Sequence, residues 1–84
     1  MKQRGITMTT YEDMRKLIGK CVEIPAHYYT WMQGARFGVV TSVRPAKPGI
    51  SACICVRMDN PRITKLVRVW RLDVEYCKVL GDVL

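Results

Sequence analysis

Hydrophobic and polar residues alternate along several short stretches of this chain, and each stretch predicts a β-strand. The alternation covers residues 20–24, 36–43, 51–58 and 63–71. Successive side chains of a strand point to opposite faces, so this period buries every second residue. A fifth strand is predicted over residues 76–80, after one tight helical turn at residues 72–75. Five short strands with a long loop after the first describe a small closed barrel.

A short helix is predicted ahead of these strands, over residues 9–19. Thr9 as the N-cap with Glu12 three residues later makes a capping box, and Gly19 provides a left-handed stop. The apolar stripe of this helix consists of Met14, Leu17 and Ile18. Because so short a helix is marginal alone, its stripe must pack against the rest of the fold.

The third and fourth predicted strands divide their two faces most clearly. The turn at residues 59–62 is short enough to require an antiparallel pair. One face of the third strand carries Ala52, Ile54, Val56 and Met58, and the other carries Cys53, Cys55 and Arg57. In the fourth strand, Val67 and Val69 are expected to point inward and Leu66, Arg68 and Trp70 outward, beside the outer residues of the third strand.

The second predicted strand contains a glycine among its apolar residues. Phe37, Val39 and Val43 are predicted to align on one face of this strand. Gly38 allows either a close approach of two backbones or a bulge.

Length and charge restrict the class of protein. The 84 residues allow one domain, predicted over residues 9–84 after a loosely ordered tail at residues 1–8. The formal net charge of +7 favours a polyanionic partner, either nucleic acid or an acidic protein, although basic charge also serves solubility alone. The sequence has no apolar run long enough to span a membrane and no signal-peptide core, so a cytoplasmic protein that does not bind membranes is expected.

The four cysteines are expected to be reduced thiols without a metal. Cys53 and Cys55 are separated by one residue in a strand, whereas zinc sites normally use Cys-x-x-Cys turns. His27 is the sole histidine that could complete such a site. Cys21 and Cys77 are expected to be small buried hydrophobic residues. The chain also lacks an activated nucleophile and a glycine-rich phosphate loop, so neither an enzyme nor a cofactor is expected.

This layout resembles the SH3-like small-barrel class, which includes KOW and Tudor-like domains. The residues that carry the resemblance are 19–22, 34–40 and 67–72. The resemblance implies a mainly β fold, a five-stranded SH3-like small barrel with a short N-terminal α-helix. It also implies a nucleic-acid-binding or protein-binding module.

One enzyme family shares this architecture and is a remote alternative. The type II dihydrofolate reductases are SH3-like tetramers with a Val-Gln-Ile-Tyr tract in their active pore. The matching residues here are Val67, Arg68, Val69 and Trp70. Arg68 replaces the glutamine and Trp70 the tyrosine, so the substrate and cofactor contacts of that family are not reproduced.

The first functional hypothesis is nucleic-acid binding through phosphate contacts and aromatic stacking. The loop at residues 25–35 is rich in aromatic residues, which stack on bases, although at least one of them is expected to plug the barrel mouth. The candidate binding residues are Tyr28, Tyr29, Trp31, Arg36, Arg57, Arg62, Lys65, Arg68 and Trp70.

The second hypothesis is a protein-protein or homo-oligomeric interface. The outer face of the third and fourth strands would expose an apolar patch of Cys53, Cys55, Leu66 and Trp70 rimmed by arginines. Alternatively, the N-terminal helix covers this face with its apolar stripe and makes it a second core.

Overall fold

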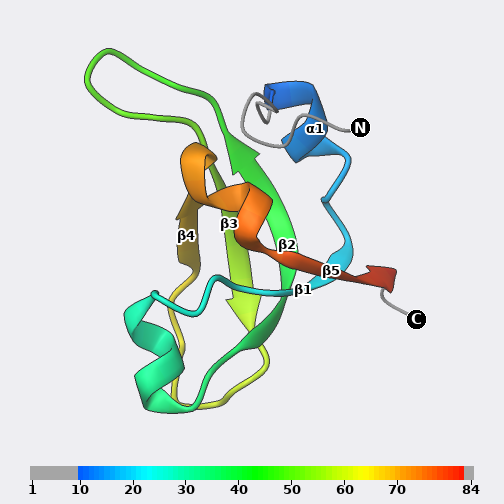
Figure 1. Cartoon of the computed structure of the whole chain (residues 1–84), viewed down its shortest axis with the longest axis vertical. Coiled ribbons are helices and arrows are strands. Elements are labelled where there is room, and N and C mark those ends of the chain that lie inside the picture. The colour runs from blue at the N-terminus through cyan, green and yellow to red at the C-terminus, as the bar shows by residue number, and fades with distance from the viewer. Residues whose placement is uncertain (1–9, 83–84) are drawn as a thin grey trace, which may run out of the picture.

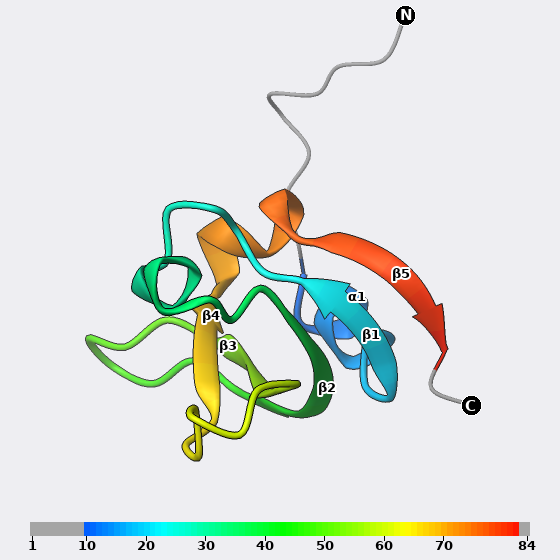
Figure 2. The same cartoon turned by 90° about the horizontal axis from the view of Figure 1, so that it is seen from below.

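The computed structural model describes residues 10–82 and shows a mainly β protein with one antiparallel sheet in the order β4-β3-β2-β1-β5 (Figure 1). The strands are β1 (Lys20–Glu23), β2 (Phe37–Arg44), β3 (Cys53–Met58), β4 (Val67–Trp70) and β5 (Lys78–Asp82). The helix α1 (Tyr11–Arg15) precedes them, and two 3-10 helices, η1 (Tyr29–Gln33) and η2 (Arg71–Tyr76), lie between strands. Figure 2 shows that the sheet is strongly curved, with β4 and β5 at its two edges.

The five predicted strands, the antiparallel β3–β4 pair and the helical turn before the last strand are confirmed. The main difference in bounds concerns β4, which begins at Val67 and not at Ile63. The connection after β3 contains a turn in which the side chain of Asn60 accepts a hydrogen bond from the Arg62 backbone N–H at 2.9 Å. The Ile63 N–H also donates a hydrogen bond to the Asn60 carbonyl at 3.0 Å. This segment therefore forms a turn, and the pairing of β4 with β3 begins at Val67.

The predicted N-cap of α1 was one residue too early. The sequence offers two overlapping capping boxes, Thr9 with Glu12 and Thr10 with Asp13. The structure shows the second of them. Thr9 lies outside the described residues. Hydrogen bonds with the backbone and with the hydroxyl of Thr10 hold the pKa of Asp13 below its ordinary value. The helix then ends at Arg15, and a turn continues to Gly19, whose φ of 89° fits the predicted left-handed stop.

The helix packs inside the curve of the sheet. Met14 is fully buried in the core and Leu17 packs against it, whereas Ile18 is exposed. The Gly19 N–H donates to the Val40 carbonyl at 2.8 Å and ties the turn after α1 to β2. The proposal that this helix covers the outer face of β3 and β4 is therefore wrong, because its apolar residues belong to the inner core.

The core lies on the inner face of the sheet. Paired residues of β2, β3 and β4 alternate between faces in rows, and the inner rows are Val43–Ile54–Val69 and Val40–Val56–Val67. The buried core cluster comprises Met14, Val22, Ile24, Ala35, Val40, Ala52, Ile54, Val56, Met58, Val69 and Val74. The predicted inner faces of β3 and β4 are thus confirmed. Among residues 10–82, no helix has both the length and the apolar character needed to cross a membrane.

The predicted alignment of β2 was wrong. Phe37 is exposed and Val39 half-buried, whereas Val40 is buried and Val43 packs against the core. The pairing of β2 with β3 shifts between Val40 and Ser42, so a bulge at Thr41 reverses which residues face inward. A strict period of two could not place this extra residue.

Gly38 is a point of close backbone approach, the first of the two alternatives that the sequence allowed. A Cβ atom at this position would lie 2.6 Å from the Arg57 carbonyl oxygen and 2.6 Å from a methyl group of Val56. Neither group can move away cheaply, because both belong to the neighbouring strand and Val56 is fully buried.

We therefore expect Gly38→Ala to lower the free energy of unfolding by about 1–3 kcal/mol, the usual cost of overpacking. Urea unfolding followed by circular dichroism measures this change. Ser42→Ala, on the exposed face of the same strand, is the matched control and should stay within about 0.5 kcal/mol of wild type. Equal stability of the two variants would contradict the close approach.

Candidate nucleic-acid interface

The outer face of β2, β3 and β4 carries two rows of paired residues. One row is Arg44–Cys53–Trp70 and the next is Ser42–Cys55–Arg68. The predicted orientation of β4 is therefore confirmed: Val69 is buried on the inner face, while Arg68 and Trp70 point outward and are exposed.

The two cysteines of these rows are buried, although the sequence predicted that they would be exposed. Cys53 is 2% exposed and Cys55 1%. Cys53 lies between Arg44 and Trp70, and Cys55 lies beside Arg68, so longer side chains of neighbouring strands flank both. Burial raises the pKa of the Cys53 thiol, the adjacent Cys55 adds to the shift, and the positive charges of Arg68 and Arg44 only partly oppose it. The Cys53 thiol in the floor of this face therefore stays uncharged.

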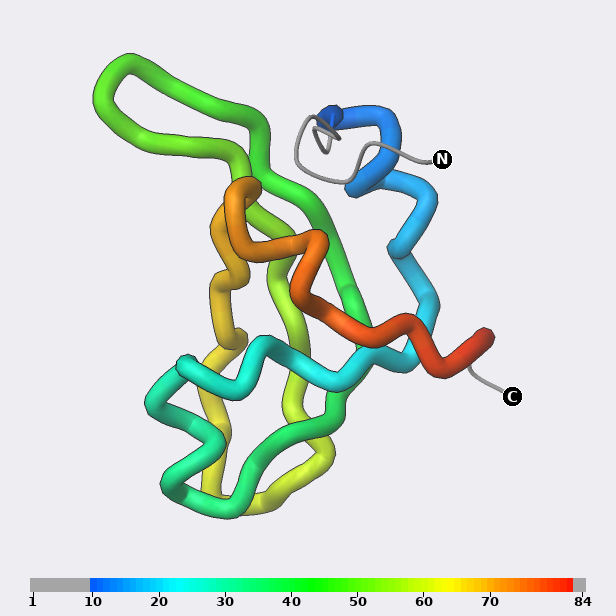
Figure 3. Tube along the Cα trace, in the orientation of Figure 1, coloured from blue at the N-terminus to red at the C-terminus, as the bar shows by residue number. Residues whose placement is uncertain are grey.

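The connection between β2 and β3 forms a narrow hairpin that projects from the sheet (Figure 3). Lys47 and Ile50 pair across its tip through two backbone hydrogen bonds of 2.9 and 2.8 Å. Between them lies Pro48-Gly49, a sequence typical of a type II turn, and Gly49 has the positive φ of 79° that such a turn needs. The turn thus fixes a lysine and an isoleucine beside the outer face.

This hairpin and the outer face together enclose two adjoining hollows. The first, of about 470 Å³, is lined by Arg44, Pro45, Lys47, Ile50, Ser51, Cys53, Arg68 and Trp70. The second, of about 510 Å³, is lined by Arg44, Cys55, Lys65, Leu66 and Arg68. They share Arg44 and Arg68, so they form one continuous surface, which we call the Trp70 groove.

Every charged side chain that lines the Trp70 groove is basic. Within residues 24–72, which include β2, β3 and β4, Asp59 is the sole acidic residue, and it lines neither hollow. Among residues 10–82, no carboxylate lies within ion-pairing distance of the four basic side chains of the groove. These four are Arg44, Lys47, Lys65 and Arg68. Their charge is therefore free to attract an anion.

Two of the three candidate aromatic residues of the β1–β2 loop hold the fold together. Trp31 packs against the core and donates its indole N–H to the Ile24 carbonyl at 2.9 Å. Tyr28 also packs against the core, so both side chains contribute to the interior of the fold. Tyr29 is 69% exposed on η1 and lines none of the hollows described here.

The Tyr28 hydroxyl links the β1–β2 loop to the end of β4. It accepts the Trp70 backbone N–H at 3.1 Å and donates to the Asp73 carboxylate at 2.8 Å. Burial raises the pKa of this phenol above its ordinary value, so it remains a donor at any physiological pH. Asp73 also lies 3.4 Å from His27, which places a second loop residue at the same joint.

Removing this hydroxyl should therefore loosen the joint that fixes Trp70. We expect Tyr28→Phe to lower the free energy of unfolding by about 1–3 kcal/mol, because the Trp70 N–H loses its partner. Thermal unfolding followed by circular dichroism measures the effect. Tyr29→Phe removes an exposed hydroxyl from the next residue and should change stability by less than about 0.5 kcal/mol. A Tyr28→Phe protein as stable as that control would show that the bridge contributes nothing.

The remaining basic candidates lie away from the Trp70 groove. The Arg36 guanidinium lies over the rings of Trp31 and Phe37, with centroid distances of 4.8 and 5.3 Å, and lies 4.0 Å from the Glu23 carboxylate. Arg62 is exposed in the turn after β3. The structure thus brings Lys65, Arg68 and Trp70 together and leaves Arg36 and Arg62 separate.

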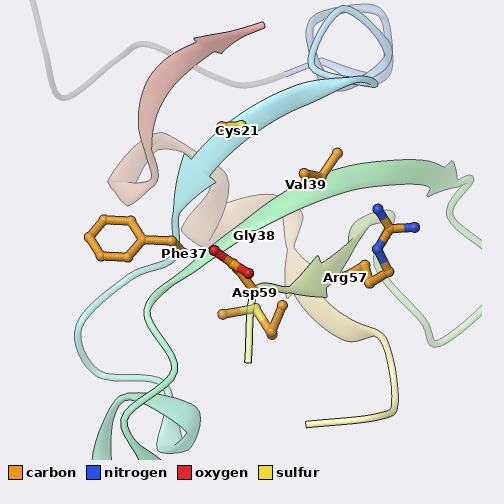
Figure 4. A pocket seen from close by; sticks show the side chains of 7 residues that line it. Cys21, Phe37, Gly38, Val39, Arg57 and Asp59 are labelled. Atoms are coloured by element: carbon orange, nitrogen blue, oxygen red, sulfur yellow. The ribbon is translucent and has the colours of Figure 1, made fainter. Parts of the chain in front are cut away.

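Arg57 lines a smaller hollow on another part of the outer face. This hollow, of about 180 Å³, lies where β1, β2 and β3 run side by side, with Cys21, Val39 and Arg57 in one row (Figure 4). Its lining includes the Asp59 carboxylate and is otherwise largely apolar, so it suits a polyanion less well than the Trp70 groove.

The thiols and carboxylates give little support to metal or nucleophilic chemistry in the described structure. Within residues 10–82, no three side chains of His, Cys, Asp or Glu lie close enough together to hold a metal ion. Burial, reinforced by the charge of Asp73, raises the pKa of Cys77 to about 12, so this thiol is a poor nucleophile.

Sequence reasoning missed half of the Trp70 groove. Arg44, Lys47 and Ile50 lie between the second and third predicted strands, and none of them was among the candidate residues. The signal that could have found them is the scarcity of acidic residues from β2 through β4, where Asp59 is the sole one and lies outside the β2–β3 connection.

No family model matches the chain, and it shows no significant similarity to a curated protein or to a solved structure. Its function therefore has to be inferred from its own residues.

Proposed function

We propose that this protein is a nucleic-acid-binding module that holds its ligand in the Trp70 groove. The observation that carries the proposal is a set of four basic side chains near an exposed tryptophan, with no carboxylate among residues 10–82 paired with them and none in the lining. Phosphates neutralise such charges, and aromatic rings of this kind stack on bases. A cationic ligand would be repelled by these charges.

The described fold supports an SH3-like barrel as the scaffold of this module. The strand order, the long loop after β1 and the tight η2 turn before β5 agree with the layout that first indicated this class. The Tyr28 bridge to Trp70 holds the β1–β2 loop against the end of β4. Scaffold and function remain separate inferences, because small barrels of one architecture serve many purposes.

The salt dependence of oligonucleotide binding tests the proposed function. Fluorescence anisotropy of a labelled oligonucleotide is measured with the whole protein at several salt concentrations. We expect the logarithm of the association constant to fall linearly with the logarithm of the salt concentration, by about 0.7 per phosphate contact on a single strand and about 0.9 on a duplex. Absence of binding at low salt, or binding that does not respond to salt, would overturn the proposal.

An assembly role for the same face has less support in the structure than in the sequence. Burial removes Cys53 and Cys55 from the apolar patch that would join two copies, and leaves Leu66, Trp70 and Ile50 exposed among basic side chains. Like charges facing one another across such an interface would oppose association. Light scattering decides the point: a dimer that dissociates when Trp70 is replaced by alanine would favour assembly.

A further inference from the structure

The Trp70 groove is concave, and this shape restricts the kind of nucleic acid that it can hold. Trp70 and Arg68 of β4 line its first hollow together with Pro45 and Ile50 of the β2–β3 hairpin, which projects beside them. The hollow lies over the buried Cys53, whose short side chain leaves the space open. Its volume of about 470 Å³ is within the range of pockets that enclose a small organic molecule, about 300–1,000 Å³.

We infer, on the basis of the proposed function, that the groove binds single-stranded nucleic acid and that an unpaired base stacks on Trp70. Trp70 is 37% exposed, so part of the residue is covered by the fold while part of it borders the hollow. Pro45 and Ile50 line the same hollow, and an aromatic ring with apolar neighbours favours a flat base. The guanidinium groups of Arg44 and Arg68 are then beside the sugar-phosphate backbone.

A duplex cannot use this arrangement. Its bases are paired and stacked inside the helix, so it presents phosphates to a basic surface and no free base to a recessed ring. A single strand can place one base in the hollow and continue across the shared arginines into the second hollow, towards Lys65. Stacking is tolerant of base identity, because every base has an aromatic face, and sequence preference is therefore expected to be weak.

The neutral floor of the groove fits the same ligand. Cys53 and Cys55 are buried, and the raised pKa of Cys53 keeps its thiol uncharged at neutral pH. A thiolate there would offset the positive charge of Arg44 and Arg68 and would repel a phosphate. The groove therefore keeps its full positive charge.

The test compares one short labelled strand of mixed sequence with the same strand annealed to its complement, each as DNA and as RNA. Fluorescence anisotropy with the whole protein at one salt concentration should show at least 10-fold tighter binding of the single strand, in DNA, RNA or both. We expect Trp70→Ala to weaken single-strand binding by about 5- to 150-fold, the usual effect of losing one stacked base, and to leave the salt dependence unchanged. Trp70→Phe should retain most of the affinity.

A second readout keeps the test independent of folding defects. The protein has two tryptophans, and Trp31 is held in the fold through its bond to Ile24. Single-stranded ligand should quench the fluorescence of wild type, whereas Trp70→Phe, which retains Trp31 alone, should show little quenching. Circular dichroism confirms that each variant is folded.

The outcomes separate this inference from the proposed function. Equal affinity for duplex and single strand, or equal quenching in wild type and Trp70→Phe, would overturn stacking on Trp70 and leave phosphate binding intact. Failure to bind either form would overturn the proposed function itself.

Discussion

Replacing Arg44 and Arg68 together by glutamine is expected to weaken single-strand binding about 25-fold at 0.1 M salt. Each phosphate contact on a single strand contributes a salt slope of about 0.7, which corresponds to about fivefold in affinity at that concentration. The two arginines are shared by both hollows, so a strand that crosses the groove meets both of them. The slope itself should fall by about 1.4 in the double variant.

The control for this experiment changes the same amount of charge elsewhere. Lys16→Gln/Lys78→Gln removes two exposed positive charges, one just after α1 and one on β5, which lies at the opposite edge of the sheet from β4. General attraction to a polyanion would make the two double variants equally weak. A localised groove predicts that the control binds nearly as well as wild type and keeps its salt slope. Equal loss in both variants would therefore contradict the site.

The faces of β3 and β4 could be predicted from the sequence because their pattern is regular. Each inner position of β3 carries an apolar residue, and in β4 the alternation of Val67 and Val69 with Arg68 and Trp70 leaves one reasonable orientation. The period of two then determines the outer face without any knowledge of the tertiary structure. The prediction of Arg68 and Trp70 as neighbours of the cysteine pair follows from the same periodicity.

The orientation of β2 and the extent of the groove could not be predicted in this way. The bulge at Thr41 depends on how β2 pairs with β3, which is a property of two strands and not of one. The sequence of β2 is also apolar at adjacent positions, Val39 and Val40, so either could have faced the core. Similarly, the position of Lys47 over the outer face depends on the direction in which a hairpin projects, and local turn preferences do not determine that direction.

The exposed state of the aromatic loop residues was equally beyond local reasoning. Tyr28, Tyr29 and Trp31 are close neighbours of similar chemistry, yet two of them contact the core and one does not. The difference arises from partners distant in sequence, since the Tyr28 hydroxyl bonds to residues of β4 and η2. Aromatic content therefore identified the loop as important but not which residue has which role.

The largest loss of stability is expected from Met14→Ala. Met14 is 0% exposed and is the one residue of α1 that is buried in the core. Truncating a buried methionine typically costs about 2–5 kcal/mol, a large fraction of the roughly 5–15 kcal/mol that stabilises a small domain. Because α1 has one regular turn and cannot persist alone, the helix should detach when this anchor is removed. Urea unfolding and amide hydrogen exchange of residues 11–15 measure the two effects.

Two controls separate anchoring of the helix from general damage. Ile18→Ala shortens an exposed apolar residue of the same segment and should cost less than about 0.5 kcal/mol, and Met14→Leu keeps the volume and should cost less than about 1.5 kcal/mol. The Trp70 groove lies on the other face of the sheet, so Met14→Ala should still bind a single strand at temperatures where it is folded. Loss of binding by the folded variant would show that α1 supports the groove as well as the core, and stability equal to wild type would show that Met14 does not anchor the helix.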